Sequence, residues 1–160
     1  MKSLHFMLLT FWLCCCSTDK EKILAANESA MLSLGTAQVT NVSFSGDANA
    51  YTFNVTVASP DTGCDQYADW WEVIDLEGNL IYRRVLAHSH VTEQPFTRSG
   101  NNIKLAADTQ VYVRAHMNTS GYGSKAQKGS VENGFIAAEL EVDFAKDLEK
   151  EEPLPTGCAF

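Results

Sequence analysis

The stretch that decides the fold is Tyr51-Thr52-Phe53-Asn54-Val55-Thr56-Val57, in which large apolar side chains alternate with polar ones. Successive side chains of a β-strand point to opposite faces of the sheet, so a period of two places the apolar residues on one face. The stretch therefore predicts a strand that is buried on one face and in contact with solvent on the other.

Other segments repeat this pattern along the chain. The same alternation occurs at Val111–Met117 and again at Leu140, Val142 and Phe144, and the residues Leu76-Glu77-Gly78-Asn79 are typical of a hairpin turn. Further short segments with strand composition lie at residues 36–44, 70–75, 80–86 and 96–105. About seven short strands with frequent turns predict an all-β fold, a single antiparallel immunoglobulin-like β-sandwich. The charged residues 145–152 are expected to form a solvated turn of helix or coil.

The first residues have the features of a lipoprotein signal peptide. Lys2 precedes an apolar core at residues 6–13, which is shorter than the about 20 residues that span a bilayer. Leu13-Cys14-Cys15-Cys16 resembles a bacterial lipobox, which predicts lipidation of Cys16, with Cys15 as the alternative. Residues 1–15 would then be the signal peptide, and residues 16–35 the lipidated cysteine and a tether.

The lipid anchor predicts an extracytoplasmic protein attached to a membrane. Residues 17–21 resemble the acidic stretch that directs Bacteroidota lipoproteins to the cell surface. We therefore expect the protein to be located in the outer membrane, and exposure at the cell surface is a further expectation. The formal net charge of the 160-residue chain is −8, which argues against nucleic acid and anionic membrane surfaces as partners. The lipid, and not charge, would therefore supply membrane attachment.

Besides Cys16, which would carry the lipid, two cysteines remain beyond the signal, Cys64 and Cys158. In an oxidising compartment two such thiols are expected to form a disulfide, the alternative being two unpaired thiols. The disulfide would pin the charged tail at residues 146–160 against a single domain at residues 36–145.

The histidines suggest a metal site. His88 and His90 are two residues apart, so both imidazoles would lie on one face of an extended strand. His116 has the parity opposite to the core positions of its strand and should face out of the sandwich. Together with Glu93 these residues could form an open site for copper or zinc. The alternative is that the histidines hydrogen-bond to the loop backbone and fix the turn at residues 91–96.

The aromatic pair Trp70-Trp71 suggests a ligand surface. Adjacent strand residues face opposite sides, so one tryptophan should fill the core and the other should reach the surface. The exposed ring, with Tyr82 or Tyr122, could stack on a sugar or another apolar ligand. Packing of the tryptophans in the core or at a sheet edge is the favoured interpretation, and ligand stacking is the alternative.

The sequence argues against an enzyme. It has no Gly-x-Ser-x-Gly motif, and Cys64 in a disulfide offers no thiolate nucleophile. Asp65, Asp69 and Glu72 could act as paired catalytic carboxylates, but a small sandwich offers a poor cleft for glycoside hydrolysis. We expect them to be solvated loop acids.

One part of the chain resembles a family of secreted bacterial proteins without assigned function. The resemblance lies in residues 61–73, in His-Ser-His-Val-Thr-Glu-Gln-Pro-Phe-Thr-Arg-Ser at 88–99, in Arg-Ala-His at 114–116 and in Gly-Tyr-Gly at 121–123. It covers roughly residues 50–125 and departs afterwards, where residues 126–134 look like an insertion. It implies no activity, but it favours a shared role for His88, His90, Glu93, Arg98 and His116.

These observations predict a lipid-anchored β-sandwich that acts as a non-enzymatic binding or accessory module for a protein or carbohydrate ligand. One alternative is a copper- or zinc-binding protein that uses the three histidines. Another alternative is a purely structural surface lipoprotein. The candidate ligand-binding residues are Trp70, Trp71, Tyr82, Arg98 and Tyr122.

Overall fold

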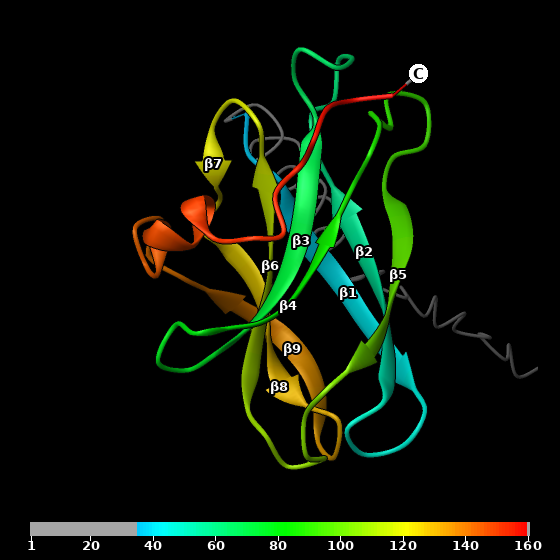
Figure 1. Cartoon of the computed structure of the whole chain (residues 1–160), viewed down its shortest axis with the longest axis vertical. Helices are drawn as coiled ribbons and strands as arrows, with labels where there is room; N and C mark the ends of the chain where they lie inside the picture. The colour runs from blue at the N-terminus through cyan, green and yellow to red at the C-terminus, as the bar shows by residue number, and fades with distance from the viewer. Residues whose placement is uncertain (1–34, 160) are drawn as a thin grey trace, which may run out of the picture.

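Two antiparallel sheets pack against each other in the computed structural model, which describes residues 35–159 (Figure 1). The smaller sheet has the strand order β1 (Gln38–Ser45), β2 (Tyr51–Ala58), β5 (Phe96–Ile103). The larger sheet has the order β4 (Leu80–Val85), β3 (Ala68–Asp75), β6 (Val111–Met117), β8 (Lys125–Ser130), β9 (Gly134–Glu139), and β7 (Gly121–Tyr122) pairs with β6. The predicted all-β sandwich is confirmed, and its immunoglobulin-like character stays a prediction.

The alternation on β2 builds one side of the core. Phe53, Val55 and Val57 are 0% exposed, while Thr52, Asn54 and Thr56 lie on the half-exposed face. From the larger sheet, inward-facing side chains of β3 and β6 pack against them, among them Trp71, Val73, Val111 and Val113. The predicted hairpin also forms, because β3 and β4 pair across a turn in which Gly78 has a φ of 91°.

The strand count and the end of the sheet differ from the prediction. Residues 35–159 form nine strands, and the apparent insertion at residues 126–134 lies in the hairpin of β8 and β9. The strand expected around Leu140, Val142 and Phe144 is absent from the described strands, and Val142 is 56% exposed. β8 and β9 are rich in Ala, Gly, Gln and Lys, so backbone pairing and not an apolar pattern extends the sheet here.

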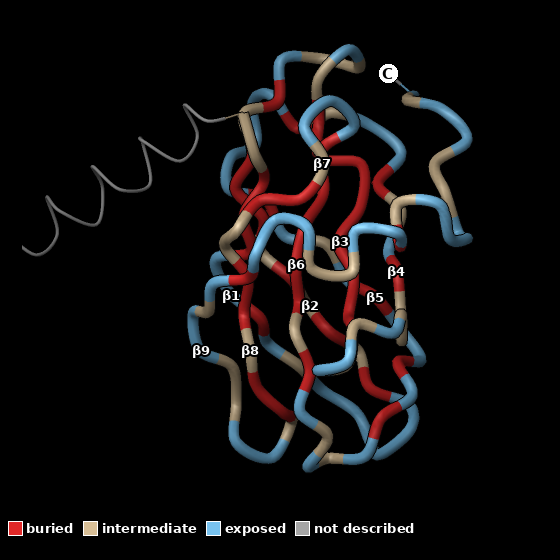
Figure 2. Tube along the Cα trace, turned by 90° about the vertical axis from the view of Figure 1, so that its left-hand side faces the viewer, coloured by how far each residue is buried: buried red, intermediate tan, exposed pale blue. Residues whose placement is uncertain are grey.

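A third layer covers the outer face of the larger sheet. We call residues 140–159 the C-terminal strap, which contains the 3₁₀ helix η1 (Lys146–Lys150) and runs in front of β3 and β6 in Figure 1. Every residue of β3 except Asp75 is buried, in line with the buried colour along this strand in Figure 2. A strand covered on one face only would alternate between buried and exposed positions, so β3 is covered on both faces.

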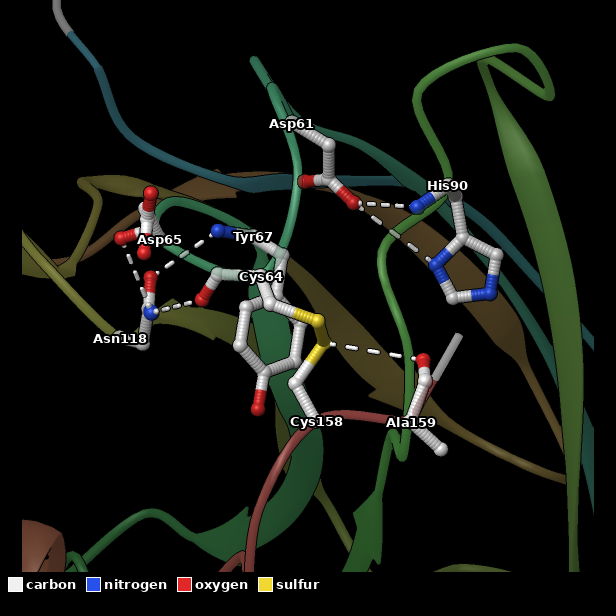
Figure 3. The surroundings of a disulfide bond; sticks show 8 residues. All are labelled: Asp61, Cys64, Asp65, Tyr67, His90, Asn118, Cys158 and Ala159. Atoms are coloured by element: carbon white, nitrogen blue, oxygen red, sulfur yellow. Dashed lines mark hydrogen bonds and ion pairs between the residues drawn. A yellow bond between two sulfur atoms is a disulfide. The ribbon is translucent and has the colours of Figure 1, made fainter.

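The predicted disulfide is confirmed. Cys64 and Cys158 are bonded, with their Cα atoms 5.6 Å apart, and the bond joins positions that are 94 residues apart (Figure 3). It fastens the end of the C-terminal strap to the loop that leads into β3.

The predicted signal peptide, the lipidation site Cys16 and the tether up to residue 34 lie outside the described residues. Within residues 35–159, no helix combines the length and the apolar character needed to cross a membrane.

Candidate functional site

A buried ion-pair triad lies under the C-terminal strap. The strand register places Glu72 of β3 opposite Arg83 of β4 and Arg114 of β6. The Oε2 atom of Glu72 accepts from Nε and Nη2 of Arg83 at 2.8 and 2.6 Å, and Oε1 accepts from Nε of Arg114 at 2.8 Å. Both carboxylate oxygens are therefore paired, as burial of a charge requires.

The backbone of the strap satisfies the remaining guanidinium donors. Arg83 and Arg114 donate to main-chain carbonyl oxygens of Phe144, Ala145, Leu148, Glu151 and Pro153. The prediction that residues 145–152 are solvated was therefore partly wrong. Several of their backbone carbonyl groups bond to buried arginines, and Leu148 is only 5% exposed. The charged side chains of this segment do not bury a face, but its carbonyl groups cover the outward-facing arginines.

Trp70 lies in the same covered layer. Its ring stacks on the imidazole of His116 with centroids 3.6 Å apart, and the guanidinium of Arg83 lies 4.6 Å from the ring centroid. Trp71 fills the core as predicted for one of the two tryptophans. The expectation that the other reaches the surface was wrong, because Trp70 is 3% exposed. The Trp70 side chain faces out of the sandwich, as expected, but the strap and neighbouring side chains bury it.

Of the remaining candidate ligand residues, one packs edge-on against Trp70, because the ring centroids of Tyr122 and Trp70 are 6.3 Å apart. Tyr82 and Arg98 have other partners. Tyr82 packs against Trp71 with ring centroids 5.6 Å apart, and Tyr122 is 4% exposed with the guanidinium of Arg114 3.5 Å from its ring. Arg98 pairs with Glu93 at 2.7 Å on the smaller sheet. The structure therefore gives these residues packing and pairing partners.

A cleft of about 700 Å³ opens between the strap and the turn that joins β6 to β7. We call it the strap cleft. Asp69, Trp70 and His116 of the larger sheet line it, together with residues 117–121 of the turn. The strap contributes Lys146, Glu149, Leu154, Pro155 and Gly157.

His116 is held firmly in this cleft. Its Nδ1 atom lies 2.7 Å from Oδ1 of Asp69, and the two side chains are only 9% and 7% exposed. A carboxylate only accepts hydrogen bonds, so Nδ1 carries the proton. The Nε2 atom lies 3.6 Å from Oε1 of Glu149, beyond hydrogen-bond distance.

Gly121 and Tyr67 also contribute to the surroundings of His116 and Glu149 in the cleft. Gly121 has a φ of +71°, and a Cβ atom there would lie 2.8 Å from Oε1 of Glu149, so a glycine leaves room for this carboxylate. Tyr67 also lines the cleft, and burial together with the negative charges of Asp69 and Asp61 raises the pKa of its phenol. The phenol therefore stays protonated and can donate a hydrogen bond.

The acidic residues near Trp70 differ in their surroundings. Asp65 is exposed as expected, but Asp69 is 5% and Glu72 0% exposed. The expectation that all three are solvated loop acids was wrong, because strand β3 carries the latter two under the strap.

The structure does not bring the predicted metal ligands together. The rings of His88 and His90 lie 4.6 Å apart, but His116 is engaged with Asp69 and Trp70, and Glu93 with Arg98. Among residues 35–159, no group of three or more His, Cys, Asp or Glu side chains is placed to hold a metal ion. The hypothesis of one copper or zinc site with all four ligands is therefore not supported by the geometry.

His90 has a packing position instead. Its ring stacks on Phe96 with centroids 3.7 Å apart, and its backbone N–H donates to Oδ2 of Asp61 at 2.7 Å (Figure 3). The backbone N–H of Glu93 donates to the His90 carbonyl at 3.2 Å, and the Gln94 side chain donates to the same carbonyl. The backbone of His90 therefore holds the turn at residues 91–96, whereas its imidazole nitrogens have no hydrogen-bond partner among residues 35–159, unlike in the alternative of rings that bond to the loop backbone.

We expect acid to destabilise the protein partly through His90. Burial, followed by the positive charge of Arg98 and the proximity of His88, lowers the pKa of His90 to about 4 from 6.5, while Asp61 and Glu93 act in the opposite direction. The unfolded chain then binds this proton first, so stability present above pH 6.5 is lost as the pH falls toward 4. An NMR titration of the imidazole should give a midpoint near 4, and His90→Phe should make the unfolding free energy less sensitive to acid. A midpoint near 6.5 in the folded protein would contradict the expectation.

Comparison with known proteins finds one informative relative. No protein-family model and no solved structure matches the chain. A protein of Halomicrobium mukohataei named "Putative lipoprotein" is 42% identical over 112 residues. The alignment covers 69% of this chain and 55% of that relative, so the chain matches about half of the relative's length.

Proposed function

We propose that this protein is an extracytoplasmic lipoprotein, anchored to a membrane through lipid on Cys16, whose β-sandwich is a non-enzymatic binding module. The lipobox-like Leu13-Cys14-Cys15-Cys16 and the name of the Halomicrobium relative both support the anchor. The acidic stretch at residues 17–21 supports placement in the outer membrane with exposure at the cell surface.

The strap cleft is the proposed binding site. The observation that carries this proposal is the imidazole of His116, which Asp69 and Trp70 hold so that its Nε2 atom is left without a hydrogen-bond partner beside the cleft. Ligand sites typically combine a cavity of about 300–1,000 Å³ with a few placed polar groups, and the cleft has both features. The disulfide and the carbonyl contacts of Arg83 and Arg114 keep its strap wall in position.

Binding is favoured over catalysis by the position of the serine hydroxyl in this cleft. Ser120 lines the cleft, but its hydroxyl donates to the carbonyl of Gly35 and not to His116. An Asp–His pair activates a serine only when the imidazole accepts the hydroxyl proton. We therefore assign His116 a role in holding a ligand.

Binding is tested by recording amide NMR spectra of the full chain with a chemically diverse fragment library. We expect ligands to shift the signals of residues 117–121 and of Glu149, which lie on opposite walls of the cleft. A library that shifts signals only elsewhere, or none at all, would overturn the assignment of the cleft.

The anchor is tested with Cys16→Ser. We expect the native protein to partition into the detergent phase and to carry the extra mass of its acyl chains, because several chains on one cysteine give stable membrane attachment. The variant should move to the aqueous phase and lose that mass, with Cys15→Ser as the control that retains both. Unchanged partitioning and mass in Cys16→Ser would refute the anchor.

A further inference from the structure

The strap cleft contains two hydrogen-bond acceptors that face each other. In the neutral form of the His116 imidazole with its proton on Nδ1, facing Asp69, the Nε2 atom presents a lone pair. The Oε1 atom of Glu149, which is also an acceptor, lies 3.6 Å away. Two acceptors at this separation do not bond to each other, and a donor placed between them would satisfy both.

The direction of the Nε2 lone pair is fixed by the surrounding structure. The imidazole stacks on Trp70 with an interplanar angle of 8°, and the ring of Tyr122 meets it edge-on at 4.8 Å between centroids. The His116 side chain is only 9% exposed, and its Nε2 atom, beside the cleft and beyond hydrogen-bond reach of Glu149, has no hydrogen-bond partner in the described part of the chain. A rigid unpaired acceptor of this kind selects for a donor.

We propose that the strap cleft binds an organic ammonium group, seated between Nε2 of His116 and the carboxylate of Glu149. This inference rests on the proposed binding function and names the ligand class. An ammonium offers three donors and no acceptor, so it can satisfy both atoms at once, and its charge complements Glu149. The net charge of −8 on the chain also favours a cation over an anion.

The walls of the cleft suit the rest of such a ligand. Leu154 and Pro155 of the strap offer apolar contact for a hydrocarbon or sugar portion. Lys146 also lines the cleft and carries a positive charge, which opposes the bound cation. Removal of this charge should therefore strengthen binding.

The test uses matched amines and their neutral counterparts on the full chain. The probes are 1,5-diaminopentane against 1,5-pentanediol, and glucosamine against N-acetylglucosamine, with the imidazole ¹⁵N signals of His116 and the amide of Gly121 as readouts. We expect the amines to shift these signals and to bind about tenfold or more tightly than the neutral partners, as a charge-assisted hydrogen bond implies.

Variants of the strap make the test specific. Glu149→Gln keeps the shape of the side chain and should weaken amine binding about tenfold or more, while Lys146→Gln should tighten it. Glu151→Gln is the matched control, because this strap carboxylate is exposed and does not line the cleft, so affinity should stay unchanged.

The outcomes separate this inference from the binding function itself. The proposal of an ammonium ligand is refuted if amines and their neutral partners bind with equal affinity. It is also refuted if Glu149→Gln leaves the affinity for amines unchanged. If the NMR signals of the cleft shift only with library compounds other than amines, the ammonium proposal is refuted and the proposed binding function stands. Cleft signals that move with neither amines nor library compounds overturn both.

Discussion

Replacing Glu72 with glutamine is expected to lower the free energy of unfolding by about 3–5 kcal/mol, the usual cost of breaking a buried ion pair. The variant leaves two guanidinium groups under the strap without a carboxylate between them. The side chains of Arg83 and Arg114 are at most 1% exposed. Uncompensated charge in such a place is costly because its water shell has been removed. Urea unfolding, followed by tryptophan fluorescence, measures the change.

Glu77→Gln is the matched control for this substitution. It makes the same chemical change in the exposed turn between β3 and β4, where no hydrogen bond or ion pair of the side chain is lost. Surface substitutions of this kind usually change stability by at most about 0.5 kcal/mol. If Glu72→Gln cost no more than this control, the triad would not hold the strap to the sheet.

Removal of the disulfide by Cys64→Ser with Cys158→Ser is expected to have an effect of similar size. The bond closes a loop between positions 94 residues apart, which restrains the unfolded chain by about 4–5 kcal/mol in the entropy model. Urea unfolding of the double variant and of the native protein measures this loss, and reduction of the native protein with dithiothreitol should reproduce it.

The double variant should also loosen one wall of the strap cleft. Without the bond, the strap is still held by the carbonyl contacts of Arg83 and Arg114, the burial of Leu148 and backbone hydrogen bonds near its two ends. We expect limited proteolysis to cut within residues 140–159 sooner than in the native protein, because weakly held termini open first. Equal cleavage rates, with equal unfolding free energies, would show that the disulfide adds nothing to the strap.

Side-chain patterns predicted the sandwich but not its full extent. The alternation at Tyr51–Ala58 and the hairpin turn at Gly78 are local signals, and both appear in the structure. β8 and β9 carried no comparable signal, since their small and polar residues join the sheet through backbone pairing with β6 and with each other. The apolar alternation after Glu139 was misleading, because the chain leaves the sheet there to become the strap.

The candidate site depended on strand order. Parity correctly placed His116 on the outer face of its strand, yet parity does not say which strands are neighbours. The register put His116 beside Trp70 and Asp69 of strand β3, and left His88 and His90 in the segment between β4 and β5. Asp69 and Glu149, the polar partners of His116, could not be recognised before these segments were placed together.

The sequence by itself determined the β class, the paired cysteines and the faces on which the apolar side chains of β2 lie, because each depends on local period or on chemical type. Only the tertiary structure decided what covers the outer face of the larger sheet. Backbone carbonyl groups of the strap accept hydrogen bonds from Arg83 and Arg114 and hold it there. Every residue has such a carbonyl group, whatever its side chain. No side-chain pattern encodes such contacts, and the burial of Trp70, Glu72 and His116 follows from them.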